Sequence, residues 1–132
     1  MKIEGLQHAG LFVTDIERSV RFYTEILGFR EIWRVTNEFP DGEERVVFVQ
    51  NGDLVIEIVQ QVHPETRRDG WFDHLALRVE ALDDLIPLLR EKGVTFEEGT
   101  YTVAPKVFEK GSKWIMFRGP DNERLELNER LK

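Results

Sequence analysis

The chain lacks cysteine, and that absence removes several kinds of chemistry. With no thiol among its 132 residues, it can form no disulfide, no thiolate metal site and no cysteine nucleophile. Basic clusters are scarce as well: Arg67-Arg68 is the only adjacent basic pair, and the net charge is -7. Because such an acidic surface repels phosphate backbones, we expect no nucleic-acid partner.

Long apolar runs are also missing. No stretch approaches the roughly 20 apolar residues that a membrane span needs, and the first residues do not resemble a signal peptide. We therefore expect no membrane partner and a cytoplasmic protein. Hydrophobic residues make up 41% of the chain and charged residues 33%, which is typical of a folded domain. The length predicts one domain, over residues 1–132.

The chain does contain one pattern written twice. Residues 8–29 and 74–96 both begin at a histidine, alternate through a strand, cross an acidic turn and continue with helical spacing up to a glycine. The apolar stripes expected on the two helices are Ile16, Val20, Tyr23 and Leu27, then Leu82, Leu85, Leu88 and Leu89. Pro87 is expected near the first turn of the second helix, where a missing N–H matters least.

Each copy continues into further strands. The alternation and the turn residues predict strands at 29–36, 44–50, 53–60, 94–98, 113–118 and 123–128, with a loop over 99–112. Each half is then a βαβββ module. We expect an α+β fold in which two tandem modules form a curved, eight-stranded, mostly antiparallel sheet with a concave cleft. Module one covers about 1–61, a linker about 62–71 and module two about 72–132.

Four polar residues stand out inside these predicted strands. His8 and His74 occupy the same position in the two copies, while Glu57 and Glu126 interrupt the last apolar strand of each half. Because side chains alternate between the two faces of a strand, all four are expected to point away from the helices, toward the cleft.

Two readings of these residues compete. Taken singly, a strand histidine or glutamate is more often a structural or solvated side chain than a metal ligand. A carboxylate inside an apolar strand, however, costs several kcal/mol unless its charge is compensated. Since the same pair occurs twice, we favour a metal site formed by His8, Glu57, His74 and Glu126. Two imidazoles and two carboxylates suit one divalent ion of Zn, Ni, Co, Mn or Fe.

These motifs resemble the vicinal-oxygen-chelate superfamily, and especially glyoxalase I and its bacterial relatives. The resemblance spans nearly the whole chain and rests on these segments: His8-Ala9-Gly10-Leu11, Phe22-Tyr23, Leu27-Gly28-Phe29, Leu54-Val55-Ile56-Glu57, Asp73-His74-Leu75-Ala76, Gly119-Pro120-Asp121-Asn122 and Leu125-Glu126-Leu127. One departure concerns Ile58-Val59-Gln60-Gln61-Val62, where glyoxalase I commonly has Leu-Thr and then an asparagine used in glutathione binding.

The resemblance implies a metal-dependent lyase or isomerase. Such an enzyme moves a proton next to the metal-polarised carbonyl of a small 2-oxo compound or its thiol adduct. Glu126 or Glu57 would be the catalytic base, and the family favours Glu126. Two alternatives on the same fold stay open: an enzyme similar to methylmalonyl-CoA epimerase, and a non-catalytic protein that binds drugs. A homodimer is also expected.

Two arginines are candidates for binding a substrate carboxylate, because a guanidinium pairs with it at two points. Arg78 lies four residues after His74, on the same face of its strand, and is the stronger candidate. Arg34 is expected to be a surface or structural charge.

Overall fold

The computed structural model describes residues 2–66, 68–70 and 72–132, and the chain divides into two compact units, 1–67 and 68–132. Arg67 of the basic pair and Trp71 of the predicted linker lie outside the described residues. No helix within the described ranges is long and apolar enough to cross a membrane.

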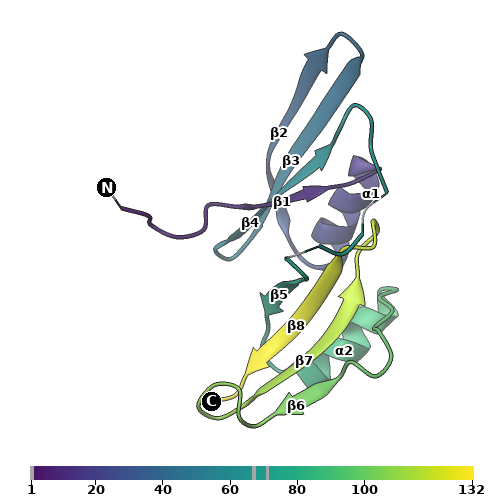
Figure 1. Ribbon diagram of the computed structural model, residues 1–132. Helices are drawn as coiled ribbons and strands as arrows, with labels where there is room; N and C mark the ends of the chain where they lie inside the picture. Colours follow the sequence, from purple (N-terminus) through teal and green to yellow (C-terminus); the bar gives the residue numbers. More distant parts are fainter. Residues whose placement is uncertain (1, 67, 71) are drawn as a thin grey trace. The chain divides into compact units, whose positions relative to one another are not determined.

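The first unit is a βαβββ module (Figure 1). Its elements in chain order are β1 (Ala9–Phe12), α1 (Ile16–Arg21), a π-helical turn η1 (Phe22–Ile26), β2 (Arg30–Phe39), β3 (Gly42–Asn51) and β4 (Leu54–Gln60). The strands form a four-stranded sheet in the order β1-β4-β3-β2. β1 runs parallel to β4, and the other two neighbouring pairs are antiparallel.

The second unit repeats this topology. It contains β5 (Leu75–Arg78), α2 (Leu82–Glu91), β6 (Thr102–Ala104), β7 (Ser112–Arg118) and β8 (Arg124–Arg130). Its sheet has the order β5-β8-β7-β6, again with one parallel pair, β5 with β8. The prediction of an α+β fold with tandem βαβββ modules is thus confirmed, and the eight strands form two four-stranded sheets.

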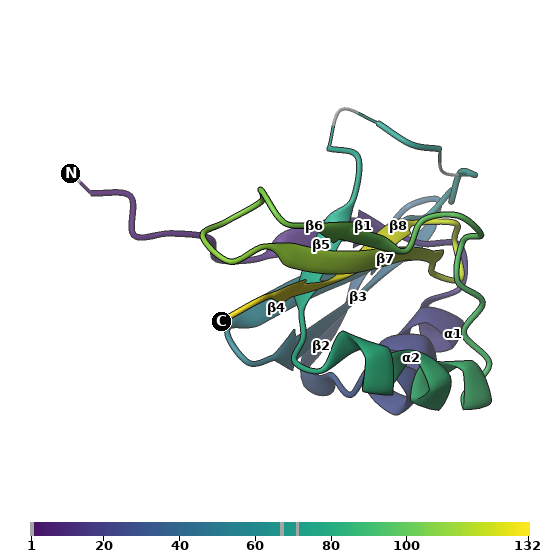
Figure 2. The same ribbon diagram turned by 90° about the horizontal axis from the view of Figure 1, so that it is seen from below.

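Each helix covers one face of its own sheet (Figure 2). The buried residues of α1 and η1 are Ile16, Ser19, Val20 and Tyr23, and α1 packs against β3 and β4. In the second unit α2 buries Leu82, Ile86 and Leu89 and packs against β8. The helix-facing strand residues are almost fully buried: Val47, Val49, Ile56, Ile58, Ile115, Phe117, Leu125 and Leu127. The other face of each sheet carries the strand glutamates together with apolar residues such as Val59 and Met116.

The predicted elements differ from the structure in the second module. The strand expected at 94–98 is reduced to an isolated bridge between Phe96 and Phe117, because the chain turns away at Gly99, whose φ is +78°. A short strand, β6, instead lies within the predicted loop. Three residues are too few for alternation to be visible in a sequence.

Helix α2 also departs from its prediction. It begins at Leu82, so Pro87 lies beyond the first turn, where it has no N–H to donate to the carbonyl of Asp83. Leu88, expected in the apolar stripe, is 55% exposed, and Ile86 is buried in its place. The helix ends at Glu91, just before Gly93, the predicted terminating residue, which adopts a positive φ of 94°.

A polar residue three positions after each strand glutamate caps the helix of its module. The Gln60 Oε1 atom accepts a hydrogen bond from the Ile16 backbone N–H at 2.9 Å. The Glu129 Oε1 atom accepts one from the Leu82 N–H, also at 2.9 Å. In the second module this bond takes the place of an N-cap side chain, since Ala81 precedes the helix. The helices are thereby fastened to the last strands of their sheets.

Replacing Gln60 with alanine is expected to lower the free energy of unfolding by about 0.5–2 kcal/mol, because a helix N–H loses its acceptor. Urea unfolding followed by circular dichroism measures the change. The matched control is Gln61→Ala, one residue further on and also half-buried, which should cost no more than about 0.5 kcal/mol. Equal losses in the two variants would contradict the capping role.

Candidate metal centre

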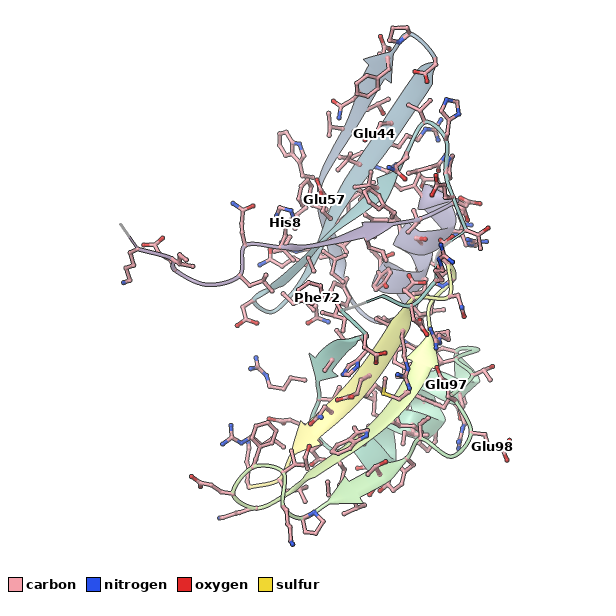
Figure 3. All side chains as sticks on the ribbon, in the orientation of Figure 1. His8, Glu44, Glu57, Phe72, Glu97 and Glu98 are labelled. Atoms are coloured by element: carbon pink, nitrogen blue, oxygen red, sulfur yellow. The ribbon has the colours of Figure 1, made fainter. Side chains whose placement is uncertain are left out.

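The first module brings His8 and Glu57 together. His8 directly precedes β1, and Gly10 lies opposite Glu57 in the parallel pairing of β1 with β4. The Nε2 atom of His8 is 3.6 Å from Oε1 of Glu57. Figure 3 shows both residues side by side on the first sheet. The Phe48 ring meets the His8 imidazole edge-on, with centroids 5.6 Å apart, and forms an apolar wall beside the pair.

The second module repeats this arrangement with His74 and Glu126. His74 directly precedes β5, and Ala76 lies opposite Glu126 in the pairing of β5 with β8. The Nε2 atom of His74 is 3.2 Å from Oε1 of Glu126. The two pairs thus occupy equivalent positions in the two modules. Each glutamate is bordered by buried apolar residues of the opposite sheet face.

Both imidazoles are held by the residue that precedes them. The Nδ1 atom of His8 is 2.8 Å from Oε1 of Gln7, and Nδ1 of His74 is 2.8 Å from Oδ2 of Asp73. Because an amide oxygen and a carboxylate only accept, Nδ1 carries the proton in each ring. Nε2 is then the ring nitrogen that faces the glutamate and can supply a lone pair to a metal ion. This is the arrangement by which outer partners orient metal-binding histidines.

The geometry of each pair fits a shared cation. A nitrogen and an oxygen bound to one ion, each at about 2.1 Å and at tetrahedral or octahedral angles, lie about 3.0–3.4 Å apart. The separations of 3.6 Å and 3.2 Å are close to this range. Within residues 2–66, 68–70 and 72–132, no three histidine or acidic side chains gather as a complete ligand set. Each module therefore contributes two of the predicted ligands.

Asp73 belongs to a wider network of charges. Its Oδ2 atom also accepts a hydrogen bond from Nη1 of Arg124 at 2.7 Å. The hydrogen bond from His74 lowers the pKa of the Asp73 carboxyl, and the bond from Arg124 lowers it further. Asp73 therefore stays ionised and remains an acceptor for His74. The sequence pattern did not identify this role, although a polar residue precedes both histidines.

The two glutamates differ in their surroundings. The Glu126 side chain is 9% exposed, and its Oε2 atom accepts a hydrogen bond from Nδ2 of Asn128 at 2.7 Å. The Glu57 side chain is 30% exposed. Val59, the residue at the equivalent position to Asn128, has no donor to offer it. Glu126 is thus the more firmly held carboxylate.

The two candidate arginines have different environments. Arg78 lies on β5 opposite Asn128, four residues beyond His74, and its side chain is exposed. Arg34 is bound by two carboxylates, Glu17 and Glu31, and both Glu31 bonds lie at 2.9–3.0 Å. These hydrogen bonds raise the pKa of Arg34 above its ordinary value. Arg34 is therefore a structural charge, as the sequence predicted.

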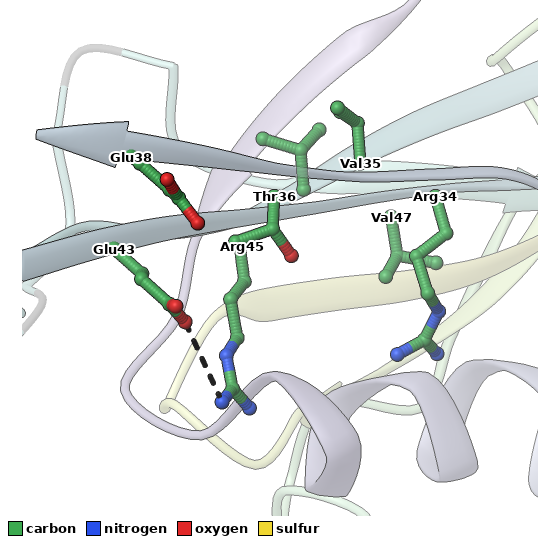
Figure 4. A pocket seen from close by; sticks show the side chains of 8 residues that line it. Arg34, Val35, Thr36, Glu38, Glu43, Arg45 and Val47 are labelled. Atoms are coloured by element: carbon green, nitrogen blue, oxygen red, sulfur yellow. Dashed lines mark ion pairs between the residues drawn. The ribbon is translucent and has the colours of Figure 1, made fainter.

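A pocket of about 290 Å³ lies elsewhere, on the β2–β3 hairpin (Figure 4). Its lining includes Arg34 and Val47, which pair across the two strands one position away from Phe48. By strand alternation it therefore opens on the face opposite to His8 and Glu57. Its two arginines face carboxylates of the same module: Arg45 is 4.0 Å from Glu43, and Arg34 binds Glu17 and Glu31. The pocket does not contribute to the candidate metal centre.

Comparison with known proteins identifies the family. Residues 5–127 match the model of the glyoxalase/bleomycin resistance protein/dioxygenase superfamily, and the chain therefore belongs to this superfamily. It is 31% identical to the lactoylglutathione lyase of Salmonella typhimurium, over 94% of this chain and 91% of that protein. The uncharacterized protein YwkD of Bacillus subtilis is 30% identical, over 98% of this chain and 99% of its own.

Solved structures show the same fold. The protein SMU.1112c superposes with a TM-score of 0.75 at 27% identity, covering 96% of this chain and 99% of its own. TnmS3, an antibiotic binding protein from Streptomyces sp. CB03234, gives a TM-score of 0.71 at 24% identity, over 99% of both chains. At that identity the second likeness concerns the fold alone.

Proposed function

We propose that this chain is a divalent-metal-dependent lyase or isomerase of the glyoxalase type. The observation that carries the proposal is the duplicated pair, in which each imidazole presents Nε2 to a glutamate while its Nδ1 is held from behind. The similarity to a lactoylglutathione lyase over most of both chains supports the same reaction class. The substrate is then a small 2-oxo compound or its thiol adduct.

His8, Glu57, His74 and Glu126 are the proposed ligands of one ion of Zn, Ni, Co, Mn or Fe. When bound, such an ion acts as a Lewis acid that polarises a substrate carbonyl and acidifies the neighbouring C–H. Asp73 and Gln7 keep the imidazoles in the tautomer that can bind it. Arg78 is proposed to pair with an anionic group of the substrate.

A carboxylate of the site is proposed to accept the proton and to return it to the adjacent carbon. The family resemblance favours Glu126 for this role. The surroundings favour Glu57, because its side chain is more exposed and Val59 stands where Asn128 donates a hydrogen bond to Glu126. We therefore propose Glu57 as the carboxylate that moves, with Glu126 as the steady ligand.

One observation favours a substrate other than a glutathione adduct. Gln60, in the segment where glyoxalase I commonly binds glutathione, uses its side-chain oxygen to cap α1. An epimerase acting on a branched acyl-CoA is the second candidate, since it needs the same proton transfer. A homodimer is part of the proposal for either activity.

The test begins with protein stripped by a chelator and reloaded with Zn, Ni, Co or Mn. It is then offered the hemithioacetal of a 2-oxoaldehyde with glutathione and, separately, a 2-methyl-branched acyl-CoA in D₂O. We expect metal-dependent turnover of one substrate, read as thioester formation or as deuterium at the branched carbon. Protein that remains metal-free after all four incubations would refute the proposal. Metal binding without either turnover would favour a binding protein.

A further inference from the structure

Buried polar side chains are few in the described part of the molecule: Ser19, Ser112 and Glu126. Two of these three are joined through Asn128. The Ser112 Oγ atom lies 2.7 Å from Oδ1 of Asn128, and Nδ2 of Asn128 lies 2.7 Å from Oε2 of Glu126. Because a buried polar group is costly without a partner, this short chain of hydrogen bonds satisfies Ser112 and Glu126 together.

The orientation of the Asn128 amide follows from its neighbours. An ionised Glu126 carboxylate can only accept, so the amide nitrogen must face it. The amide oxygen is then directed at Ser112, whose hydroxyl donates to it. Turning the amide over would place its oxygen against the Glu126 carboxylate, two acceptors facing each other, and would break that hydrogen bond. Ser112 is fully buried in β7, and so the chain is anchored in the sheet.

The consequence for Glu126 is that its two oxygens are no longer equivalent. Oε2 is occupied by Asn128, whereas Oε1 lies 3.2 Å from Nε2 of His74. Without the amide, the carboxylate could rotate and present either oxygen, or both. In the first module the equivalent position, two residues after Glu57, is Val59, whose side chain has no hydrogen-bond donor.

We propose that Asn128, tethered by Ser112, is a positioning residue that holds Glu126 with only Oε1 directed at the metal beside His74. The inference rests on the proposed metal site and deepens it. Glu126 would then bind the metal ion through one carboxylate oxygen only.

The experiment titrates Co²⁺ into apoprotein and records both the dissociation constant and the visible absorption spectrum, which reports coordination. Asn128→Leu keeps the branched side-chain shape and removes the amide. Ser112→Ala leaves the amide in place and removes its tether, together with a longer hydrogen bond of 3.2 Å to the Glu129 carbonyl oxygen. Asn37→Leu is the matched control. The Asn37 Nδ2 atom also donates to a glutamate, Glu44, at 3.1 Å. Glu44 lies on β3, and Figure 3 shows it on the β2–β3 hairpin, away from His8 and Glu57.

Asn128→Leu is expected to weaken Co²⁺ binding by about 10- to 100-fold and to alter the spectrum, as loss of an outer partner does at other metal sites. Ser112→Ala should change both readouts in the same direction by a smaller factor, and Asn37→Leu should change neither. Thermal denaturation separates lost folding from lost binding. If Asn128→Leu does not fold, the Ser112→Ala result decides.

Two outcomes overturn the inference in different ways. In the first, the wild type binds Co²⁺, and Asn128→Leu (or Ser112→Ala, if Asn128→Leu does not fold) has the same affinity and spectrum. Asn128 then does not position Glu126, while the proposed metal site stands. If the wild type itself binds no metal, the proposed function fails, and the inference fails with it.

Discussion

His74→Ala is expected to weaken divalent metal binding by more than about 100-fold, and His8→Ala to do the same, while His63→Ala leaves it unchanged. The first two changes remove a proposed ligand. Even the outer partners of metal-bound histidines are worth about 10- to 100-fold in affinity, so a lost ligand should cost more. Competition with a chromophoric chelator measures each dissociation constant.

The chain offers an internal control because it has only three histidines. His63 lies 2.9 Å from an acidic partner, Asp41, and its side chain is 77% exposed. It thus has the same kind of ion pair as the candidate ligands without a place in either His–Glu pair. If His63→Ala lost as much affinity as His74→Ala, the observed metal would be bound nonspecifically by the acidic surface.

The number of metal ions bound per wild-type chain tests whether the two His–Glu pairs form one site. One ion per chain, lost in both His8→Ala and His74→Ala, would mean that the two pairs serve a single site. Two ions per chain, falling to one in each variant, would mean that each pair binds its own ion. The second result would contradict the proposed four-ligand set.

Much of the candidate site was predictable because the same histidine and glutamate positions occur in both modules. A glutamate among the apolar residues of 54–59 is conspicuous, and strand alternation alone places it opposite to Ile56 and Ile58. Both of those isoleucines are buried against the helix side, as expected. The pairing of each glutamate with a histidine then follows from strand topology, since the first and last strands of each module are neighbours.

The features that the sequence did not predict occur in only one of the two modules. Asn128 has valine at the equivalent place in the first module, so comparison of the two halves says nothing about its bond to Glu126. The position of Pro87 depends on Ala81, whose left-handed φ of 51° sets the start of α2. Neither residue carries a periodic signal. Their roles are decided by tertiary contacts.

Phe117→Ala is expected to lower the free energy of unfolding by about 3–5 kcal/mol, the usual cost of removing a buried phenylalanine ring. Phe117 is completely buried in the middle of the second sheet. Its ring packs edge-on against Phe96 with centroids 5.6 Å apart, and it lies opposite Leu125 in β8. Alanine would leave a cavity that the surrounding sheet and helix cannot fill. Urea unfolding followed by circular dichroism measures the loss.

Phe108→Ala is the matched control, because that ring is 52% exposed and its described ring contact is with Arg130, whose guanidinium lies 4.4 Å from the ring centroid. The expected cost is about 1 kcal/mol or less. A loss below about 1.5 kcal/mol in Phe117→Ala would show that the core relaxes around the cavity.

The same variant separates stability from binding. Phe117 faces the helix side of its sheet, whereas its neighbour Met116 lies opposite Glu126 on the other face. Folded Phe117→Ala protein should therefore bind Co²⁺ with nearly wild-type affinity. His74→Ala should lose metal affinity but keep nearly wild-type stability, since the His74 side chain is 36% exposed and little packing is lost. If the core variant lost metal while still folded, the His74–Glu126 pair would depend on packing across the sheet as well as on its own hydrogen bonds.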